Sequence, residues 1–499
     1  MQRIQESWII LAFAALFTFL FYHEEPGINL FIFESLFIVL LAVRKQLNIK
    51  SVLQLTLFLG LILTLLATVI THSVFSYFMN FIALFLFVGG QAYPTSRSMV
   101  SSFFTAVSNM FPSQWRLLRS LSEMSVRGQR LGPFLGRLAV FIVPLAVVIV
   151  FILIYSASSP WFNEMMGVVT QGIRDVIEYI SQNVEFELIA LFVFGMVLSG
   201  FLWLSRKSER VVRYDVEAGD QMDAPATMPE LTSVKKGGEY RAAVFLFGLL
   251  NVLILILNVL DITKVWFGFE WNGSYLKQLV HEGTFLLIFS ILISIGIVLY
   301  IFRGKLNTIR GNTFLHWLAY AWLAQNAVLV ISVGIRNFWY IHYFALAYKR
   351  IGVMVFLLLT LYGLYTVFVK VNQQYSTFYL LRRNTYAMFV ILILASLPDW
   401  DSMIARYNFN HADKAFLHLD YMSTLSDHSL HILDVPVEEI RSATAGQEQR
   451  FDLNERIDYM TPEQYAERIK WRKDSFRKRW ERRGWLSWNY ADYNACRRL

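Results

Sequence analysis

The residues with the clearest chemical potential lie in the segment 314–370, where two long apolar runs flank an aromatic connector. Gln325 and Asn326 fall near the middle of the first run, and Arg336 and Arg350 stand at the two ends of the connector. Polar groups are costly in hydrocarbon, so they usually face the interior of a helix bundle or a water-filled cavity. Amide groups there could coordinate a substrate, and the planar fork of arginine suits phosphate and carboxylate. These four residues are therefore the first candidate ligand site.

The amides also have a structural interpretation. Gln325 and Asn326 could form interhelical hydrogen bonds with Asn251 or Asn258, each contributing about 0.6–2 kcal/mol. Glu34 is the acidic residue that lies well inside an early apolar run, and it could carry protons. It could equally be a neutral or paired carboxyl in a tilted helix, because an unpaired buried charge is expensive. For all three residues, ligand binding and structure remain alternatives.

The two arginines have an alternative role as anchors. Arg336 and Arg350 both fall at a predicted membrane edge, where long cationic side chains extend into the interface. Trp339, Tyr340 and Tyr343 lie between them and would form an ordinary aromatic belt. Because Arg350 abuts the start of the following span, we expect Arg350→Ala to be more damaging than Arg336→Ala.

Other kinds of chemistry find little support in the sequence. Cys496 is the single cysteine, which excludes an intramolecular disulfide framework and a Cys-based zinc site. No Walker-type loop, GxSxG elbow or glycine fingerprint is present. Neither HExxH nor tight HxH spacing occurs among four histidines near the C-terminus, which are His411, His418, His428 and His431. The sequence therefore predicts no catalytic residue, no metal and no cofactor.

The elements that must position these residues are membrane-spanning helices. Of the 499 residues, 56% are hydrophobic and only 16% are charged, whereas soluble domains carry about 25% charged residues. A spanning helix needs about 20 mainly apolar residues. Eleven segments qualify, near 7–22, 28–43, 51–70, 73–93, 136–157, 187–205, 242–260, 283–302, 314–335, 351–369 and 384–398. The predicted fold class is an all-α polytopic transmembrane bundle of about eleven spans with a small helical C-terminal tail.

Lys and Arg residues indicate the orientation of these spans. With the N-terminus inside, the inside segments hold 22 Lys and Arg and the outside loops hold 6, as the positive-inside rule requires. Eleven spans then place the tail outside. We divide the chain into an N-terminal membrane half (1–205), a cytoplasmic linker (206–241), a C-terminal membrane half (242–398) and a soluble helical tail (399–499). Within the linker, the stretch 214–240 is expected to be flexible.

Two amphipathic surface helices are expected outside the spans, one in the outside loop 158–186 and one in the inside loop 94–135. The inside loop 94–135 contains a stretch typical of an interfacial helix. In the tail, Thr461-Pro462-Glu463-Gln464 forms a capping-box start for a helix that runs to about Arg483, where Gly484 stops it. This helix holds nine Lys and Arg against four Asp and Glu. Its predicted side of the membrane favours anionic headgroups over nucleic acid as a target.

A set of short motifs resembles the end of a bacterial membrane-protein family. The motifs are Pro398-Asp399, Ile404-Ala405-Arg406-Tyr407-Asn408, Leu419-Asp420-Tyr421-Met422, Leu425-Ser426-Asp427 and Trp485-Leu486-Ser487-Trp488-Asn489. The family is catalogued as domain of unknown function 4173, with a close relative numbered 4153. The connector from Arg336 to Arg350 is similar to a further element of that family, with Ala345 and Ala347 replacing its Gly and Thr. The resemblance covers about residues 180–499 and implies a polytopic bacterial inner-membrane protein without an established activity.

The tail motifs are expected to have structural roles. Asn408 and Asp420 should satisfy backbone groups as turn or cap residues, and Trp485 and Trp488 should pack against the protein. The complete set of expected structural residues is Arg406, Asn408, Asp420, Trp485, Trp488 and Asn489. We expect the tail to be an ordered unit docked on the bundle.

Three classes of function follow from the sequence. The first is a non-enzymatic protein of the bacterial inner membrane whose extracytoplasmic tail binds an envelope protein partner or the membrane surface. The second is a transporter of a small or amphipathic solute with a site around Gln325, Asn326 and Arg336. The third is a membrane enzyme acting on a lipid-linked substrate. The absence of paired acidic clusters in the spans lowers the third class, and the sequence favours the first. The bilayer is the expected environment, and no nucleic acid is expected as a partner.

Overall fold

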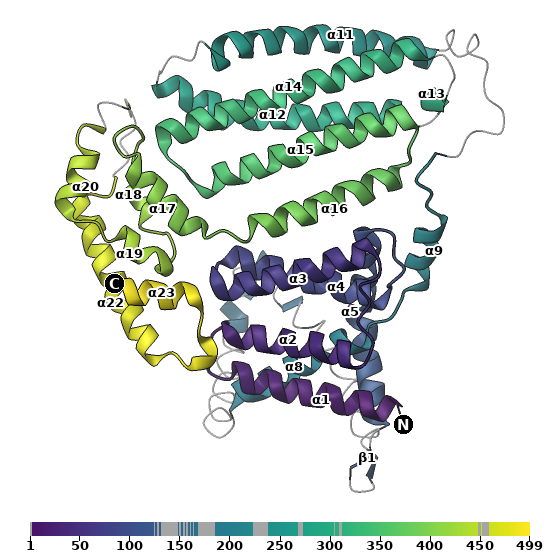
Figure 1. The fold of residues 1–499 in the computed structure, drawn as a ribbon, viewed down its shortest axis with the longest axis vertical. Helices are drawn as coiled ribbons and strands as arrows, with labels where there is room; N and C mark the ends of the chain where they lie inside the picture. Colours follow the sequence, from purple (N-terminus) through teal and green to yellow (C-terminus); the bar gives the residue numbers. More distant parts are fainter. Residues whose placement is uncertain are drawn as a thin grey trace.

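Where the computed structural model describes the chain, it is all-α except for one hairpin of two-residue strands, in which β1 (Ser125–Val126) pairs with β2 (Gln129–Arg130). Apart from a few scattered positions, the structure describes residues 2–123, 185–222, 238–267, 273–303, 305–308, 312–447 and 459–499. Figure 1 shows the long helices in two stacked bundles, with the C-terminal segment at one end of both. We call this the tail end and the other the opposite end.

Seven described helices are long and apolar enough to cross a membrane, and three shorter stretches are also apolar. The seven are α3 (Val52–Ile70), α4 (Val74–Ala92), α8 (Phe186–Leu204), α11 (Gly238–Asp261) with its π-helical extension η1 (Ile262–Trp266), α14 (Thr313–Phe344), α15 (Tyr348–Gln373) and α16 (Thr377–Ala395). The shorter stretches lie in α1 (Gln2–Phe21), α2 (Ile28–Val43) and α12 (Gly273–Ile301). Ten of the eleven predicted spans therefore coincide with a helix, while 136–157 falls almost wholly outside the described residues. The predicted fold class is confirmed.

The N-terminal bundle consists of α1, α2, α3, α4 and α8. α1 packs mainly against α8, and α3 packs against α4. Phe33 and Phe37 are one helical turn apart, as are Leu57 and Leu61, so each pair presents a single face. All four side chains are at most 1% exposed and belong to one core cluster.

The C-terminal bundle is built around α14, which packs against α11, α12 and α15. α16 packs against α15 and also contacts α3 and α5 (Met99–Ser122) of the first half. Phe389 and Ile393 of α16 belong to the N-terminal core, whereas Tyr379 and Leu380 belong to the C-terminal core. α16 therefore joins the two bundles.

α5 lies across the opposite end, nearly perpendicular to the spans (Figure 1). Five of its polar residues are buried on the side that packs against α4 and α8, whereas six of its large apolar residues point outward. The buried set is Ser101, Ser102, Thr105, Asn109 and Ser113, and the exposed set is Phe103, Phe104, Val107, Met110, Phe111 and Trp115. An outward apolar set of this kind is typical of a helix at a membrane interface; the interfacial location of the loop 94–135 stays a prediction.

The predicted flexible linker is docked in its described part. Residues 209–217 form α9 (Glu209–Glu217), and the side chain of Asp215 is fully buried. It accepts hydrogen bonds from the Arg97 backbone at 3.0 Å and from the hydroxyls of Tyr93 and Ser101. Beyond α9, Arg382 Nη2 lies 2.5 Å from Asp220 Oδ2. The predicted flexibility is therefore wrong for residues 214–222, because the buried carboxylate of Asp215 ties them to α5 and to the loop before it.

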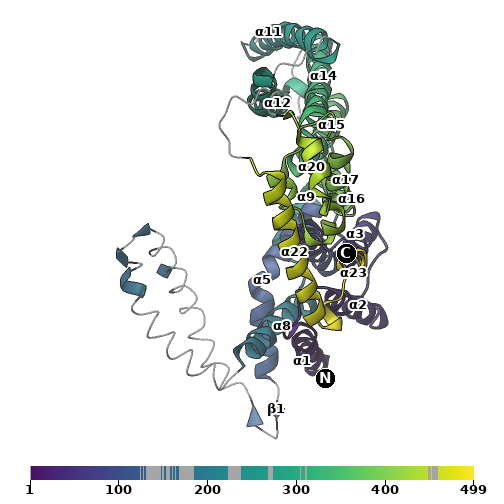
Figure 2. The ribbon, with the colours of Figure 1, turned by 90° about the vertical axis from the view of Figure 1, so that its left-hand side faces the viewer.

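The tail forms a separate helical unit with its own core, at the tail end of the bundles (Figures 1 and 2). Its elements are α17 (Trp400–Asn410), α18 (Leu419–Met422), η2 (Asp427–Ser429), α19 (Leu430–Leu433), α20 (Val437–Thr444), α22 (Pro462–Arg482), η3 (Trp485–Ser487) and α23 (Tyr490–Arg498). The predicted capping box of α22 is present, with Gln464 N donating to Thr461 Oγ1 at 3.2 Å and Thr461 N to Gln464 Oε1 at 2.9 Å. The buried residues Tyr465, Ile469 and Phe476 fix α22 onto the other tail helices.

Candidate functional site at the tail end of the bundle

The amide of Gln325 is bound by a neighbouring helix. Its Nε2 donates to Asn251 Oδ1 at 2.7 Å, and Asn258 Nδ2 donates to the Gln325 carbonyl oxygen at 3.0 Å. Asn251 Nδ2 in turn donates to the Leu318 carbonyl oxygen at 3.0 Å. A ladder of amides thus joins α11 to α14, as in the interhelical alternative predicted from the sequence. The ligand-binding role of Gln325 stays a prediction.

Asn326 and Glu34 are both buried, but in different bundles. Asn326 Nδ2 donates to the Trp322 carbonyl oxygen at 2.8 Å, within its own helix. Asn80 Nδ2 donates to Glu34 Oε1 at 2.7 Å, and Thr64 donates to the Asn80 side-chain oxygen. The second oxygen of Glu34 and Asn326 Oδ1 have no partner among the described residues. The structure therefore does not bring Glu34 to the other predicted site residues.

Arg336 forms a buried ion pair near the tail end of α14. Its Nη2 lies 2.5 Å from Asp261 Oδ1, and the two side chains are 7% and 6% exposed. Asp261 ends α11, where the chain continues into the π-helical turn, and Trp266 from that turn donates to Ser332 Oγ at 2.8 Å. Arg336 is therefore a helix-to-helix tie. The sequence analysis did not identify Asp261 as the partner of Arg336. Its position directly after the apolar run 242–260 could have indicated it.

Arg350 closes the connector between α14 and α15. Its Nη1 donates to the carbonyl oxygens of Phe344, at 2.5 Å, and of Ala345. Its guanidinium lies 4.3 Å above the centroid of the Tyr340 ring. A cation at the C-terminal end of a helix complements the partial negative charge of its last carbonyls. Ala345 has φ 65° and ψ −175°, a region that normally requires glycine. The connector is thus held in a tight, strained turn.

Asn408 fastens the tail to this connector. Its side chain accepts from Leu346 N at 2.7 Å and donates to the Leu346 carbonyl oxygen at 3.0 Å. Tyr421 receives a further hydrogen bond from Tyr348 N at 3.1 Å, and Asp420 accepts from Met460 N at 3.1 Å. Asn408 and Asp420 do satisfy backbone groups, as expected, but on segments distant in sequence.

An acidic pair surrounds His428 at the start of α17. His428 Nε2 lies 2.9 Å from Asp399 Oδ1 and 3.8 Å from Asp401 Oδ2, and the imidazole is 2% exposed. Burial alone would lower the pKa of His428, but the hydrogen bond to Asp399 and the two carboxylates outweigh it and raise the pKa. At Asp399, burial alone would raise the pKa, but the hydrogen bond to His428 and the charge of His428 outweigh it, so the pKa of Asp399 is lowered. Within the described part of the chain, no cluster of His, Cys, Asp and Glu could hold a metal.

The end of the tail contacts the loop between α1 and α2. Arg483 bridges Asp492 at 2.5 Å and Glu25 at 2.6 Å. The Ile28 backbone donates to the Trp488 carbonyl oxygen at 2.8 Å. A Cβ on Gly27 would lie 2.6 Å from the Ser487 backbone, so only glycine permits this approach. Segments more than 450 residues apart thereby close the tail end of the molecule.

Two predicted tail residues need correction or comment. Trp485 is 68% exposed, so the expectation that it packs is wrong. Successive side chains of a 3₁₀ turn point about 120° apart, and Leu486 takes the buried direction into the N-terminal core. Trp488 is partly buried beside Tyr493, with ring centroids 6.0 Å apart. Asn489 caps α23 by accepting from the Asp492 backbone at 2.8 Å.

Arg406, the last of the expected structural residues, is exposed on α17. α22 carries six exposed Lys and Arg residues, and one flank of this helix differs from the rest. Arg468, Arg479 and Arg482 are spaced so that they share a side of the helix with Trp471. We call these four residues the basic flank. The acidic residues Glu463, Glu467, Asp474 and Glu481 follow another side.

The chain is similar to one catalogued family. The family model described as Domain of unknown function (DUF4153) matches residues 35–435. The match therefore runs from α2 to α19 and includes the connector and the Asn408 contact. It falls on the relative numbered 4153, while a relation to the family numbered 4173 stays a prediction. No curated protein and no solved structure matches the chain.

Proposed function

Since the chain belongs to the family described as Domain of unknown function (DUF4153), whose description names no activity, we propose a function from its geometry. We propose that the protein is a multi-pass scaffold of the bacterial cytoplasmic membrane. It acts by binding rather than by catalysis, and it holds its tail rigidly so that α22 faces an anionic partner of the cell envelope.

The observation that carries this proposal is the docking of the tail. Asn408 binds both backbone polar groups of Leu346, and Arg483 bridges the tail to Glu25 of the first loop. These contacts fix the tail to the C-terminal bundle and to the N-terminal bundle. Figure 2 shows α22 on the face of the tail that looks away from the bundles. A fixed helix with an exposed basic flank suits recognition of an anionic surface, because electrostatic complementarity speeds encounter and sets specificity.

The orientation is part of the proposal. The loops that hold most Lys and Arg follow the ends of α2, α4, α8 and α12, which meet at the opposite end of the molecule. The positive-inside rule places such loops in the cytoplasm. The N-terminus is then cytoplasmic and the tail extracytoplasmic.

The transporter alternative is weakened by how its residues are used. Gln325 donates to Asn251, and Arg336 is paired with Asp261. A solute would have to displace buried partners whose loss is costly. The enzyme alternative gains no support from the described residues around His428, because Asp399 is hydrogen-bonded to His428 and Asp401 accepts from the Ser426 hydroxyl.

The proposal is tested with the full-length protein in nanodiscs of zwitterionic lipid. The probe is a polyphosphate chain, and binding is measured at low and at physiological ionic strength. We expect binding to weaken with salt, and to weaken by about tenfold in the double variant Arg468→Glu, Arg482→Glu, which reverses two charges of the basic flank. The matched control, Lys207→Glu with Arg210→Glu, carries the same charge change at the opposite end and should bind as wild type. Equal loss in both double variants, or no binding to the wild type, would contradict the proposal.

A further inference from the structure

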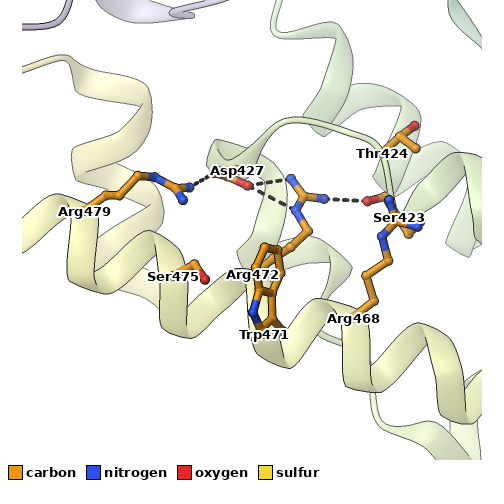
Figure 3. Close-up of a pocket in the computed structure, with 8 residues that line it drawn as sticks. All are labelled: Ser423, Thr424, Asp427, Arg468, Trp471, Arg472, Ser475 and Arg479. Atoms are coloured by element: carbon orange, nitrogen blue, oxygen red, sulfur yellow. Dashed lines mark hydrogen bonds and ion pairs between the residues drawn. The ribbon is translucent and has the colours of Figure 1, made fainter. Parts of the chain in front are cut away.

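A pocket opens beside the basic flank of α22, where the helix meets the turn after α18. It has a volume of about 370 Å³, within the range of small-molecule sites. Figure 3 shows Arg468 and Arg479 on either side of Arg472 along the helix, with the indole of Trp471 beside them. The lining residues are Ser423, Thr424, Asp427, Arg468, Trp471, Arg472, Ser475 and Arg479.

The floor of this pocket is fixed by Arg472. Its Nη2 lies 2.5 Å from Asp427 Oδ1, and its guanidinium also donates to the carbonyl oxygens of Ser423, at 2.7 Å, and Leu425, at 2.5 Å. The side chain is 14% exposed. Most donors of Arg472 are therefore occupied by contacts within the protein, and these contacts hold the turn after α18 in place.

The other two arginines keep donors for a ligand. Arg479 contacts the second oxygen of Asp427, but its side chain remains 52% exposed. A guanidinium has five donors, so one carboxylate oxygen leaves most of them free. Arg468 is exposed and has no ion pair among the described residues. Three arginines against one aspartate give the pocket a net positive charge.

The pocket also offers a flat surface. Trp471 is 68% exposed, whereas tryptophan side chains are highly buried on average. An exposed indole next to cations provides a face on which a ring can stack. The hydroxyl of Ser475 lies in the same wall and makes no hydrogen bond among the described residues.

We infer that this pocket binds a sugar unit that carries an oxyanion, either phosphate or carboxylate. The sugar ring lies on Trp471, and the oxyanion lies against Arg468, one helical turn away on the same side of α22, whose fork matches either group. This inference rests on the proposed function, because it names the chemistry that the basic flank recognises. An acyl chain is disfavoured, since the pocket lies on the tail and is lined by charged and hydroxyl groups.

Calorimetry on the full-length protein in nanodiscs tests the inference with four probes: glucose 6-phosphate, glucuronate, inorganic phosphate and glucose. We expect one or both anionic sugars to bind with a dissociation constant of about 0.1–1 mM, and glucose not to bind. The phosphate and carboxylate arms identify the oxyanion. Arg468→Ala should weaken binding by about tenfold, and Trp471→Ala should weaken the anionic sugar but not inorganic phosphate.

The matched control is Lys470→Ala, which removes an exposed cation from another side of α22 and should leave sugar binding unchanged. Equal weakening by Lys470→Ala and Arg468→Ala, or no saturable binding of either anionic sugar, would overturn the inference. Polyphosphate binding that survives Arg468→Ala alongside absent sugar binding would refute the pocket while the scaffold proposal stands. Sugar binding that persists where polyphosphate does not bind would refute the scaffold proposal alone.

Discussion

At the scale of single residues, Ala345 carries the strain of the connector. Its φ of 65° with ψ near 180° costs about 1–3 kcal/mol for a residue with a Cβ. Ala345→Gly removes that strain, while added freedom of the unfolded chain costs about 0.4–1 kcal/mol. We expect a net stabilisation of about 1 kcal/mol, measured by thermal unfolding in detergent. Ala347→Gly is the control, because φ −151° is unstrained. It should not stabilise, and an equal gain in both variants would contradict this explanation.

The ion pair between Arg336 and Asp261 reverses the order of importance expected from the sequence. Removing one partner of a buried pair leaves an uncompensated charge and costs about 3–5 kcal/mol. Loss of Arg350 removes hydrogen bonds to carbonyls, at about 1.5–3 kcal/mol for a charged donor. Arg336→Ala should therefore destabilise more than Arg350→Ala, measured as folded yield and unfolding temperature. The double variant Arg336→Met, Asp261→Leu should recover most of the loss. A double variant as unstable as Arg336→Ala would count against the pair.

Sequence reasoning reached some of these side chains and not others. The amide ladder from Gln325 to Asn251 was foreseeable, because amides inside apolar runs must find each other. The partner of Arg336 was not, because an apolar run reveals that a helix spans but not how it is rotated against its neighbours. The same limit hid the contact of His428 with Asp399, which are 29 residues apart.

At the scale of elements, the start of α17 is a pH-sensitive contact between tail segments. The pKa of His428 is raised by Asp399 and Asp401 against the effect of burial, so its contribution to stability is complete below its ordinary value of 6.5. That contribution is lost as pH rises through the raised pKa. Asp399, with its lowered pKa, loses its contribution only as pH falls below 3.8. The contact is thus strongest between these two values.

We therefore expect the unfolding temperature of the wild type to fall as pH rises above 6.5, and to fall more than that of a variant without an ionisable group at position 428. His428→Gln keeps a donor but cannot be charged, so its profile over the same range should be flatter. His411→Gln serves as the control, since His411 bonds a backbone carbonyl within its own helix. Parallel profiles for the wild type and His428→Gln would sink the idea.

The elements themselves were predictable to different degrees. Long apolar runs and the capping box of α22 follow from local composition, and both are present. The docking of α9 was not predictable. Its polar sequence resembles a linker, and contacts with distant segments keep it in place, such as those of Asp215 with α5 and the preceding loop and of Tyr214 with Phe378. The domain boundaries drawn from the sequence stay a prediction.

At the scale of the whole molecule, topology can be tested with single cysteines. Cys496 is partly buried against the tail core, so it is a poor reporter. In a Cys496→Ser background, Lys478→Cys places a thiol on exposed α22, and Lys207→Cys places one at the opposite end. We expect a membrane-impermeant maleimide to label position 478 in intact spheroplasts and position 207 only after lysis. The reverse pattern would put the tail in the cytoplasm.

The contact between the first loop and the end of the tail has a consequence in time. Hydrogen bonds and an ion pair join Glu24 and Glu25 to Ser487 and Arg483, across sequence separations of 458 to 463 residues. At about 5–20 residues per second, a ribosome needs roughly half a minute to a minute and a half to cover that distance. Throughout this interval the first hairpin sits in the bilayer with its loop uncovered. A chain that stops before Arg483 never covers it, so an exposed Glu24–Gly27 loop marks a product whose synthesis has not reached the tail.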